Sequence, residues 1–206
     1  MENITTAIIS LSALVAAITA LIVNLIKAKE TVENSLPKKI KNQCSVNIEI
    51  TNRLEETKEI MKADRVQIYD FHNGGHYANG RSALKTSCSY EVIRTGIKGY
   101  QKELQAVPLS CIPRFVRTLL DSGELKINNL EDIKESMPAT YELKKAENVG
   151  SFYDIILNNK ENEPIGFLAL QYAKPGCVNF NEVEMNQILK LKFFIEENLE
   201  KMAMEK

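Results

Sequence analysis

The chain has 206 residues, with 26 basic and 27 acidic side chains and a formal net charge of −1. This balance excludes the strongly basic surface on which non-specific nucleic-acid binding depends, so we expect no nucleic-acid partner. The part of the chain that follows the N-terminal region is long enough for one domain.

The N-terminal stretch Ile4–Ile26 carries no charge, although 26% of the whole chain is charged. As a helix it would span roughly 34 Å, enough to cross a hydrocarbon core of ~30 Å. A cleaved signal peptide is disfavoured because residues 1–3 contain no lysine or arginine. A buried core helix is disfavoured because the mild polar residues are scattered rather than gathered in one stripe. The stretch therefore predicts a transmembrane helix.

Lysines follow this stretch at positions 27, 29, 38, 39 and 41, and none precedes it. Because basic residues favour the cytoplasmic side, this predicts a single-pass inner- or cell-membrane protein with a cytoplasmic C-terminal domain and membrane lipid as a partner. The expected organisation is a transmembrane anchor with a basic juxtamembrane linker over residues 1–36, then a folded domain over residues 37–206.

The remaining elements follow from hydrophobic periodicity and from turn residues. In chain order they are a helix over 38–62, a strand over 65–71, a loop over 71–81, a strand over 83–93, a helix from Pro113 to Leu120, a short strand over 125–127, a helix over 140–147, two strands over 151–157 and 165–172 joined by a polar hairpin loop, and a helix over 181–202. This order predicts an α+β fold, an antiparallel sheet with the N- and C-terminal helices packed on one face, preceded by one transmembrane helix.

The chain resembles the GAF family of small ligand-binding sensor domains, which are related to PAS domains. The residues that carry the resemblance are Ala63–Tyr69 after the first helix, Phe152–Leu157 and Glu163–Leu170 around the hairpin, and Asn179–Glu184 at the start of the last helix. It covers roughly residues 40–203 and implies a GAF-like sensor fold. It implies no ligand, because the segment 71–81 departs from the GAF pattern and no chromophore-attachment or cyclic-nucleotide signature is present.

The segment Phe71–Glu91 contains both histidines of the chain and is unusually rich in asparagine and glycine. Its donors and aromatic side chains could form a ligand pocket, in which Arg81 and Lys85 would suit an anionic small molecule such as a phosphate or a carboxylate. The candidate ligand-binding residues are His72, Asn73, Tyr77, Asn79, Arg81, Lys85, Ser87, Tyr90 and Glu91.

Two other interpretations of this segment stay open. Asparagine and glycine could simply build a turn, with His72 satisfying buried backbone groups. A metal or catalytic site is also conceivable from the HxxxH spacing of His72 and His76, or from a pair of Cys88 and His72. Gly74 and Gly75 between the histidines disfavour the helix that a metal site with this spacing needs, so we name no metal ligand, no catalytic residue and no cofactor.

The first functional hypothesis is a membrane-anchored, non-enzymatic GAF-like module that senses a small ligand and signals through its terminal helices and membrane segment. It predicts a homodimer or a higher homo-oligomer. The alternative is a structural or membrane-active interaction protein, with some similarity to small membrane proteins of phages and low-GC bacteria, in which the GAF-like domain is a scaffold for oligomerisation. An enzymatic role is the least favoured of the three.

Overall fold

The computed structural model describes residues 15–29 and 36–204. Residues 15–29 are helical. Within the described ranges, no helix combines the length and the apolar character that a membrane crossing needs. This finding contradicts the transmembrane helix predicted over Ile4–Ile26 and the single-pass membrane location inferred from it; residues 4–14 of that stretch lie outside the described residues.

The chain divides into two compact units, Met1–Val46 and Asn47–Lys206. The first unit contains the helix of residues 15–29 and the beginning of helix α2 (Leu36–Met61). The second unit contains the rest of α2 and all of the sheet, and it is the part described below.

The second unit is built on one six-stranded antiparallel sheet with the strand order β3-β2-β1-β6-β5-β4. The strands are β1 (Arg65–His76), β2 (Ser82–Ile93), β3 (Val107–Pro108), β4 (Glu124–Ile127), β5 (Ser151–Asn158) and β6 (Pro164–Tyr172). Two hairpins, β1–β2 and β5–β6, form its centre, and β6 pairs with β1 to join them.

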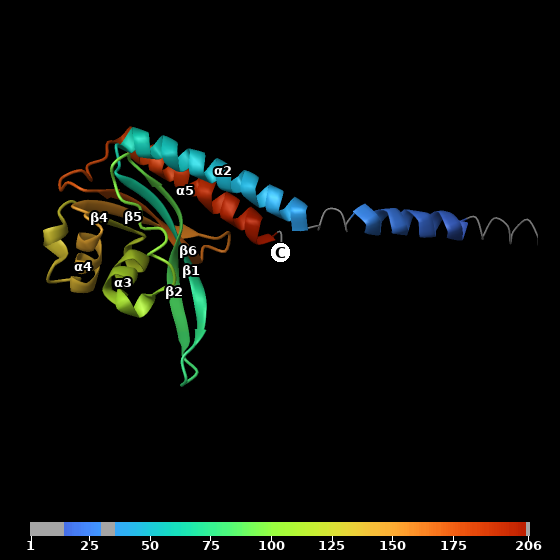
Figure 1. Cartoon of the computed structure of the whole chain (residues 1–206), viewed down its shortest axis with the longest axis horizontal. Coiled ribbons are helices and arrows are strands. Elements are labelled where there is room, and N and C mark those ends of the chain that lie inside the picture. The colour runs from blue at the N-terminus through green and yellow to red at the C-terminus, as the bar shows by residue number, and fades with distance from the viewer. Residues whose placement is uncertain (1–14, 30–35, 205–206) are drawn as a thin grey trace, which may run out of the picture. The chain divides into compact units, whose positions relative to one another are not determined.

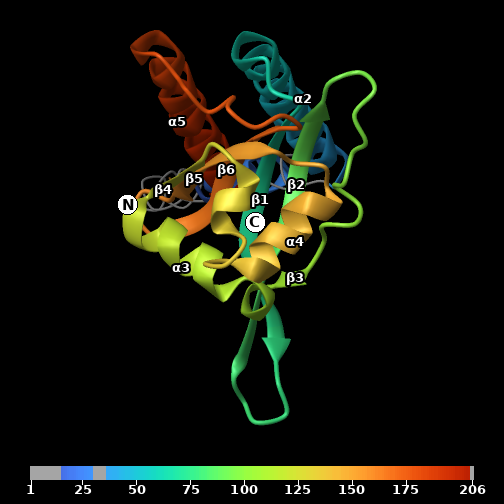
Figure 2. The same ribbon diagram turned by 90° about the vertical axis from the view of Figure 1, so that its left-hand side faces the viewer.

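Helices cover both faces of this sheet (Figures 1 and 2). One face carries α2 from Asn47 onward together with α5 (Glu182–Met204). The other face carries α3 (Pro113–Ser122) and α4 (Pro138–Ala146), with the short 3-10 helices η1 (Leu109–Cys111) and η2 (Leu130–Ile133). The second unit therefore has a three-layer α+β arrangement. The α+β class and the antiparallel sheet agree with the sequence prediction, which did not foresee the layer formed by α3 and α4.

Alternating side chains of the central strands fill the two layers between sheet and helices. Tyr69 and Phe167 belong to the core under α3 and α4, whereas Ile68 and Leu168, one residue away in each strand, point to the opposite face and are fully buried. Gly166 is required where β6 approaches β1, because a Cβ atom there would lie 2.0 Å from the carbonyl oxygen of Tyr69.

The start of α5 follows the capping pattern expected from the sequence. The side chain of Asn181 accepts the backbone N–H of Glu184 at 3.0 Å, and the Glu184 carboxylate accepts the N–H of Asn181 at 2.9 Å. The largest departure lies in β1, which continues through the expected loop to His76 and leaves only residues 77–81 as the turn.

Candidate functional site

The layer between the sheet and the helices α3 and α4 contains a small buried cavity. It is lined by Tyr69, Thr86, Leu104, Val107, Ile112, Phe115, Thr140, Leu143, Lys144 and Phe167, and its volume is about 20 Å³. The rings of Tyr69 and Phe167 stack with their centroids 4.5 Å apart, and Phe115 meets Phe167 edge-on at 5.6 Å. Such a cavity has room for about one water molecule.

Two polar side chains in this apolar wall lack the partners that buried groups normally have. Thr86 is 2% exposed, and its hydroxyl has no hydrogen-bond partner. Lys144 is 4% exposed. Its ammonium lies 5.9 Å from the ring centroid of Tyr69 and 5.3 Å from that of Phe152, and it forms no ion pair with any residue that the structure describes. The Thr86 hydroxyl and the Lys144 ammonium are therefore available to contact a molecule bound in this layer.

A wider groove adjoins the cavity and shares Ile112 and Thr140 with it. Its volume is about 240 Å³, and the first turns of α3 and α4 supply its remaining residues: Pro113, Arg114, Met137, Pro138 and Ala139. The groove therefore lies between the two helix starts, and the cavity lies next to it against the sheet.

Both helix starts leave backbone donors without a cap. Each helix begins with a proline, neither has a side-chain cap, and neither carries an acidic residue in its first turn. The helical hydrogen bonds begin with Val116 N–H to Ile112 O and Tyr141 N–H to Met137 O, so the preceding N–H groups point out of the helix ends. Two positive helix ends with Arg114 nearby favour a negatively charged group. Lys144 belongs to the last turn of α4 and lines the adjoining cavity.

Two buried carboxyl groups, Asp154 of β5 and Glu147 at the end of α4, lie between the sheet and α4. Asp154 is fully buried and neither carboxylate oxygen has a hydrogen-bond partner, and one oxygen of Glu147 is unpaired as well. Burial raises the pKa of Asp154 to about 7, Lys144 opposes this rise and Glu147 adds to it. Beside them the Arg65 guanidinium is fully used, because it donates to Gln171 Oε1 at 2.8 Å and to the carbonyls of Glu147 at 2.7 Å and Lys98 at 3.0 Å.

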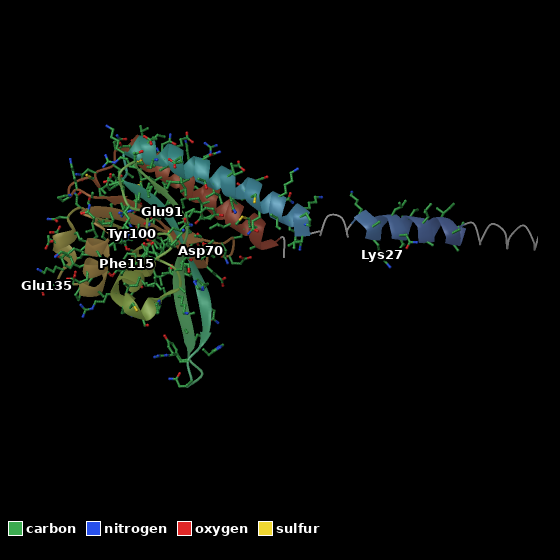
Figure 3. All side chains as sticks on the ribbon, viewed as in Figure 1. Lys27, Asp70, Glu91, Tyr100, Phe115 and Glu135 are labelled. Atoms are coloured by element: carbon green, nitrogen blue, oxygen red, sulfur yellow. The ribbon has the colours of Figure 1, made fainter. Side chains whose placement is uncertain are left out.

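Glu91 lies on this same face, but it has a structural role. Its carboxylate accepts the backbone N–H groups of Tyr100 and Gln101 and the side-chain amide of Gln67, all at 2.8–3.0 Å. Figure 3 shows Glu91 and Tyr100 close together next to the sheet. Glu91 thereby fixes the segment that delivers Leu104 and Val107 to the cavity wall.

The other residues singled out in the sequence lie away from the cavity. Tyr90 donates to Asn47 of α2 at 2.6 Å, and His72 and Ser87 contact each other at 2.9 Å where β1 and β2 run side by side. Asn73, Tyr77, Asn79 and Arg81 are exposed at the end of the hairpin, and Lys85 is half-buried beside it. The structure thus gathers six of the nine residues on one projecting hairpin rather than in the enclosed cavity.

Among the described residues, Cys88 and the histidines do not come together as a catalytic or metal site would require. Burial raises the pKa of the Cys88 thiol far above its usual range, and its Sγ donates to the carbonyl of Tyr90 at 3.3 Å. In the described ranges, no cluster of three His, Cys, Asp or Glu side chains could hold a metal ion.

Sequence reasoning missed Lys144, Thr86 and Arg114. One signal was available for Lys144, because Thr140, Tyr141, Lys144 and Glu147 follow one helical face with the spacing of a buried stripe, and all four are buried. A lysine within such a stripe marks a buried charge.

Comparison with solved structures identifies the class of fold. The phycoerythrobilin-bound GAF domain of a cyanobacterial phytochrome superposes with a TM-score of 0.59 at 18% identity, covering 85% of this chain and 96% of that one. A far-red cyanobacteriochrome photoreceptor gives a TM-score of 0.59 at 11% identity, covering 86% and 98%. A domain of a two-component sensor histidine kinase from Sinorhizobium meliloti 1021 gives 0.51 at 15% identity, covering 75% and 90%.

The chain therefore has a GAF-like fold. No protein-family model matches the sequence, and no curated protein is significantly similar to it. The similarity to phage and low-GC bacterial membrane proteins finds no support in these comparisons.

Proposed function

We propose that this protein is a GAF-like sensory module that binds a small anionic molecule between the sheet and the helices α3 and α4. The observation that carries the proposal is the unpaired Lys144 ammonium in the wall of an otherwise apolar cavity. The GAF domains among the similar structures include bilin-binding photoreceptor domains, which supports ligand binding as the general role of the fold.

The sizes of the two spaces suggest how the ligand binds. The groove of about 240 Å³ accommodates a small molecule, whereas the cavity of about 20 Å³ accommodates a single atom group. The anionic group of the ligand would lie at the two helix starts, within reach of Lys144, and its body would occupy the groove. This arrangement uses the positive helix ends and the buried cation together.

Ligand binding would be transmitted through α4. Lys144 shares this helix with Tyr141 and Glu147, and Glu147 contacts Arg65 at the first residue of β1. A ligand that favours one position of α4 would shift the conformations of the domain toward that position. No chemical step is needed for this role, so the proposal is a non-enzymatic one.

Thermal unfolding of the full chain tests the proposal. Inorganic phosphate and short dicarboxylates serve as probes, and the expected result is a saturable rise in Tm that is absent in Lys144→Met. The matched control is Lys145→Met, which removes an exposed cation from the same helix and should keep the rise. A rise of equal size in all three proteins would overturn the proposal, as would no rise in the unmodified protein with any of the probes.

We also infer that the protein forms a homodimer through α2 and α5. A groove of about 190 Å³ runs between these helices and is lined in part by Ile60, Leu191 and Phe194. Phe193 of α5, which lines a separate groove with the β5–β6 turn, is 65% exposed and Ile48 of α2 is 61% exposed, and a second copy could cover these side chains. Sedimentation of the full chain at several concentrations, compared with Phe193→Glu, tests this inference; a monomer at all concentrations would contradict it.

A further inference from the structure

The hairpin of β1 and β2 extends past the rest of the sheet as an isolated two-stranded ribbon. We define the ribbon as residues 71–84. Pairing of β1 with β6 ends at Asp70, which lies opposite Gly166. β3 pairs with β2 only at Lys85 and Thr86. β1 and β2 continue to pair beyond these points, as far as His76 opposite Ser82. Figures 1 and 2 show the ribbon projecting from the body of the domain.

The outer edge of β1 in the ribbon is open to another strand. β6 begins at Pro164, which pairs with Asn158 and has no N–H to donate, so the sheet cannot continue along β1 beyond Asp70. Within the described part of the chain, no strand pairs with this edge between Phe71 and His76. An open edge of this kind offers a row of backbone donors and acceptors to a partner.

The ribbon has one sign of charge. No aspartate or glutamate lies between Asp70 and Glu91, whereas Arg81 and Lys85 both lie there. The whole chain has a net charge of −1, so the positive charge is concentrated here and does not reflect overall composition. The side chains of residues 72–82 are exposed, which leaves this charge accessible.

The two permanent cations are held against the ribbon. The Arg81 guanidinium lies 4.6 Å from the ring centroid of Tyr77. The stem of Lys85 crosses Gly74 so closely that a Cβ there would lie 2.5 Å from its Cδ and Cε atoms. Asn73 and Asn79 each accept a backbone N–H two residues later, at 3.0 and 3.2 Å, and so fix the turn. Cations positioned in advance lose little entropy when an anion binds.

We propose that the ribbon is a docking site for an extended acidic peptide segment of a partner protein, which adds to the open edge of β1 as a further strand. The edge supplies the backbone pairing, and Arg81 and Lys85 supply the charge complementarity. Nucleic acid fits less well, because two permanent cations contact few phosphates. This docking site is separate from the cavity and would be a place where a sensory module contacts its output protein.

Fluorescence anisotropy of the full chain tests this proposal. The probe is a labelled twelve-residue peptide of alternating Glu and Thr, and we expect saturable binding with hydrogen-exchange protection of the amides of residues 71–76. The double variant Arg81→Ala/Lys85→Ala should weaken binding about tenfold. The control Arg117→Ala/Lys201→Ala, which removes two exposed cations from other elements, should bind as the unmodified chain does.

A second probe separates strand addition from simple charge attraction. The same peptide with alternate backbone nitrogens methylated keeps its charge but loses half of its backbone donors, and its binding should be about tenfold weaker. Equal binding of both peptides would overturn the proposal. Tighter binding of single-stranded DNA of the same charge would overturn it as well, as would no binding of the unmethylated peptide.

Discussion

Both carboxylate oxygens of Glu91 accept the backbone N–H of Tyr100, at 3.0 and 2.9 Å. One of them also accepts the N–H of Gln101 at 3.0 Å. A side chain of β2 thereby fixes the start of a segment that has no regular structure of its own before β3. Because Leu104 and Val107 of this segment line the cavity, the shape of the candidate site depends on this anchor.

Removal of the anchor should therefore cost stability. We expect Glu91→Ala to lower the free energy of unfolding by about 2–3 kcal/mol, because several charge-assisted hydrogen bonds are lost and their backbone donors are left unpaired. Urea unfolding measures the change. The control is Glu103→Ala in the same segment. The Glu103 carboxylate is half exposed and forms an ion pair with Lys98, so its removal should cost less than about 1 kcal/mol. Equal losses in the two variants would contradict the anchoring role.

Asp154 should make stability depend on pH. Burial raises its pKa to about 7 in the folded protein, whereas an unfolded aspartate titrates near about 4. Between pH about 4 and about 7, the folded state therefore keeps a proton on Asp154 that the unfolded state has released. The free energy of unfolding should fall as the pH rises through this range. Asp154→Asn should remove this dependence and be more stable than the unmodified protein at pH 8, by up to about 4 kcal/mol. Denaturant unfolding from pH 4.5 to 8 measures both curves; parallel curves would show that Asp154 does not titrate in this way.

Gly166 should tolerate no side chain. A Cβ would lie 2.0 Å from the Tyr69 carbonyl oxygen and 3.0 Å from its carbonyl carbon, and both are backbone atoms in a central strand. We expect Gly166→Ala to cost about 3 kcal/mol or more, measured as a loss of Tm. Gly80→Ala is the comparison, since Gly80 has a positive φ of 79° but open space around it, and its cost should be about 1 kcal/mol. A smaller loss for Gly166→Ala than for Gly80→Ala would contradict the close strand approach.

Lys144 should reduce stability when no ligand is bound. A buried ammonium without an ion pair is less stable than an apolar side chain of the same length, so Lys144→Met should raise the free energy of unfolding by about 1 kcal/mol in a buffer whose only anion is chloride. Denaturant unfolding of the two proteins in a buffer of neutral amine with chloride as counter-ion measures the difference. A loss of stability in Lys144→Met would assign Lys144 a structural role instead.

Much of the fold was predictable because the strongest patterns are local. The strands around the Asn158–Pro164 hairpin are continuous apolar runs bounded by polar turn residues, and Asn181 with Glu184 forms a recognisable cap, so these elements lie within a few residues of their predicted positions. Residues 71–81 of the ribbon were predicted as a loop because their asparagines and glycines tolerate left-handed backbone. The structure uses Gly74 for a different reason, since Lys85 crosses the strand at that position.

The candidate site was less accessible to sequence reasoning. Thr86, Lys144 and Arg114 come from three elements that are far apart in the chain, and only the packing of α3 and α4 on the sheet brings them to one region. Hydropathy also favoured a membrane span over Ile4–Ile26, whereas no helix among the described residues is long and apolar enough to cross a membrane. Apolar composition identifies a candidate segment, but the length of the helix decides whether it can cross a bilayer.

The central claim is that a small anion binds between the starts of α3 and α4 beside Lys144. A titration of the 15N-labelled full chain with inorganic phosphate, followed by 1H–15N NMR, tests this claim most directly. We predict saturable shifts of the amides of Arg114, Phe115, Ala139 and Thr140 that are lost in Lys144→Met and kept in Lys145→Met. Shifts confined to amides near exposed lysines elsewhere, or unchanged in Lys144→Met, would contradict the claim.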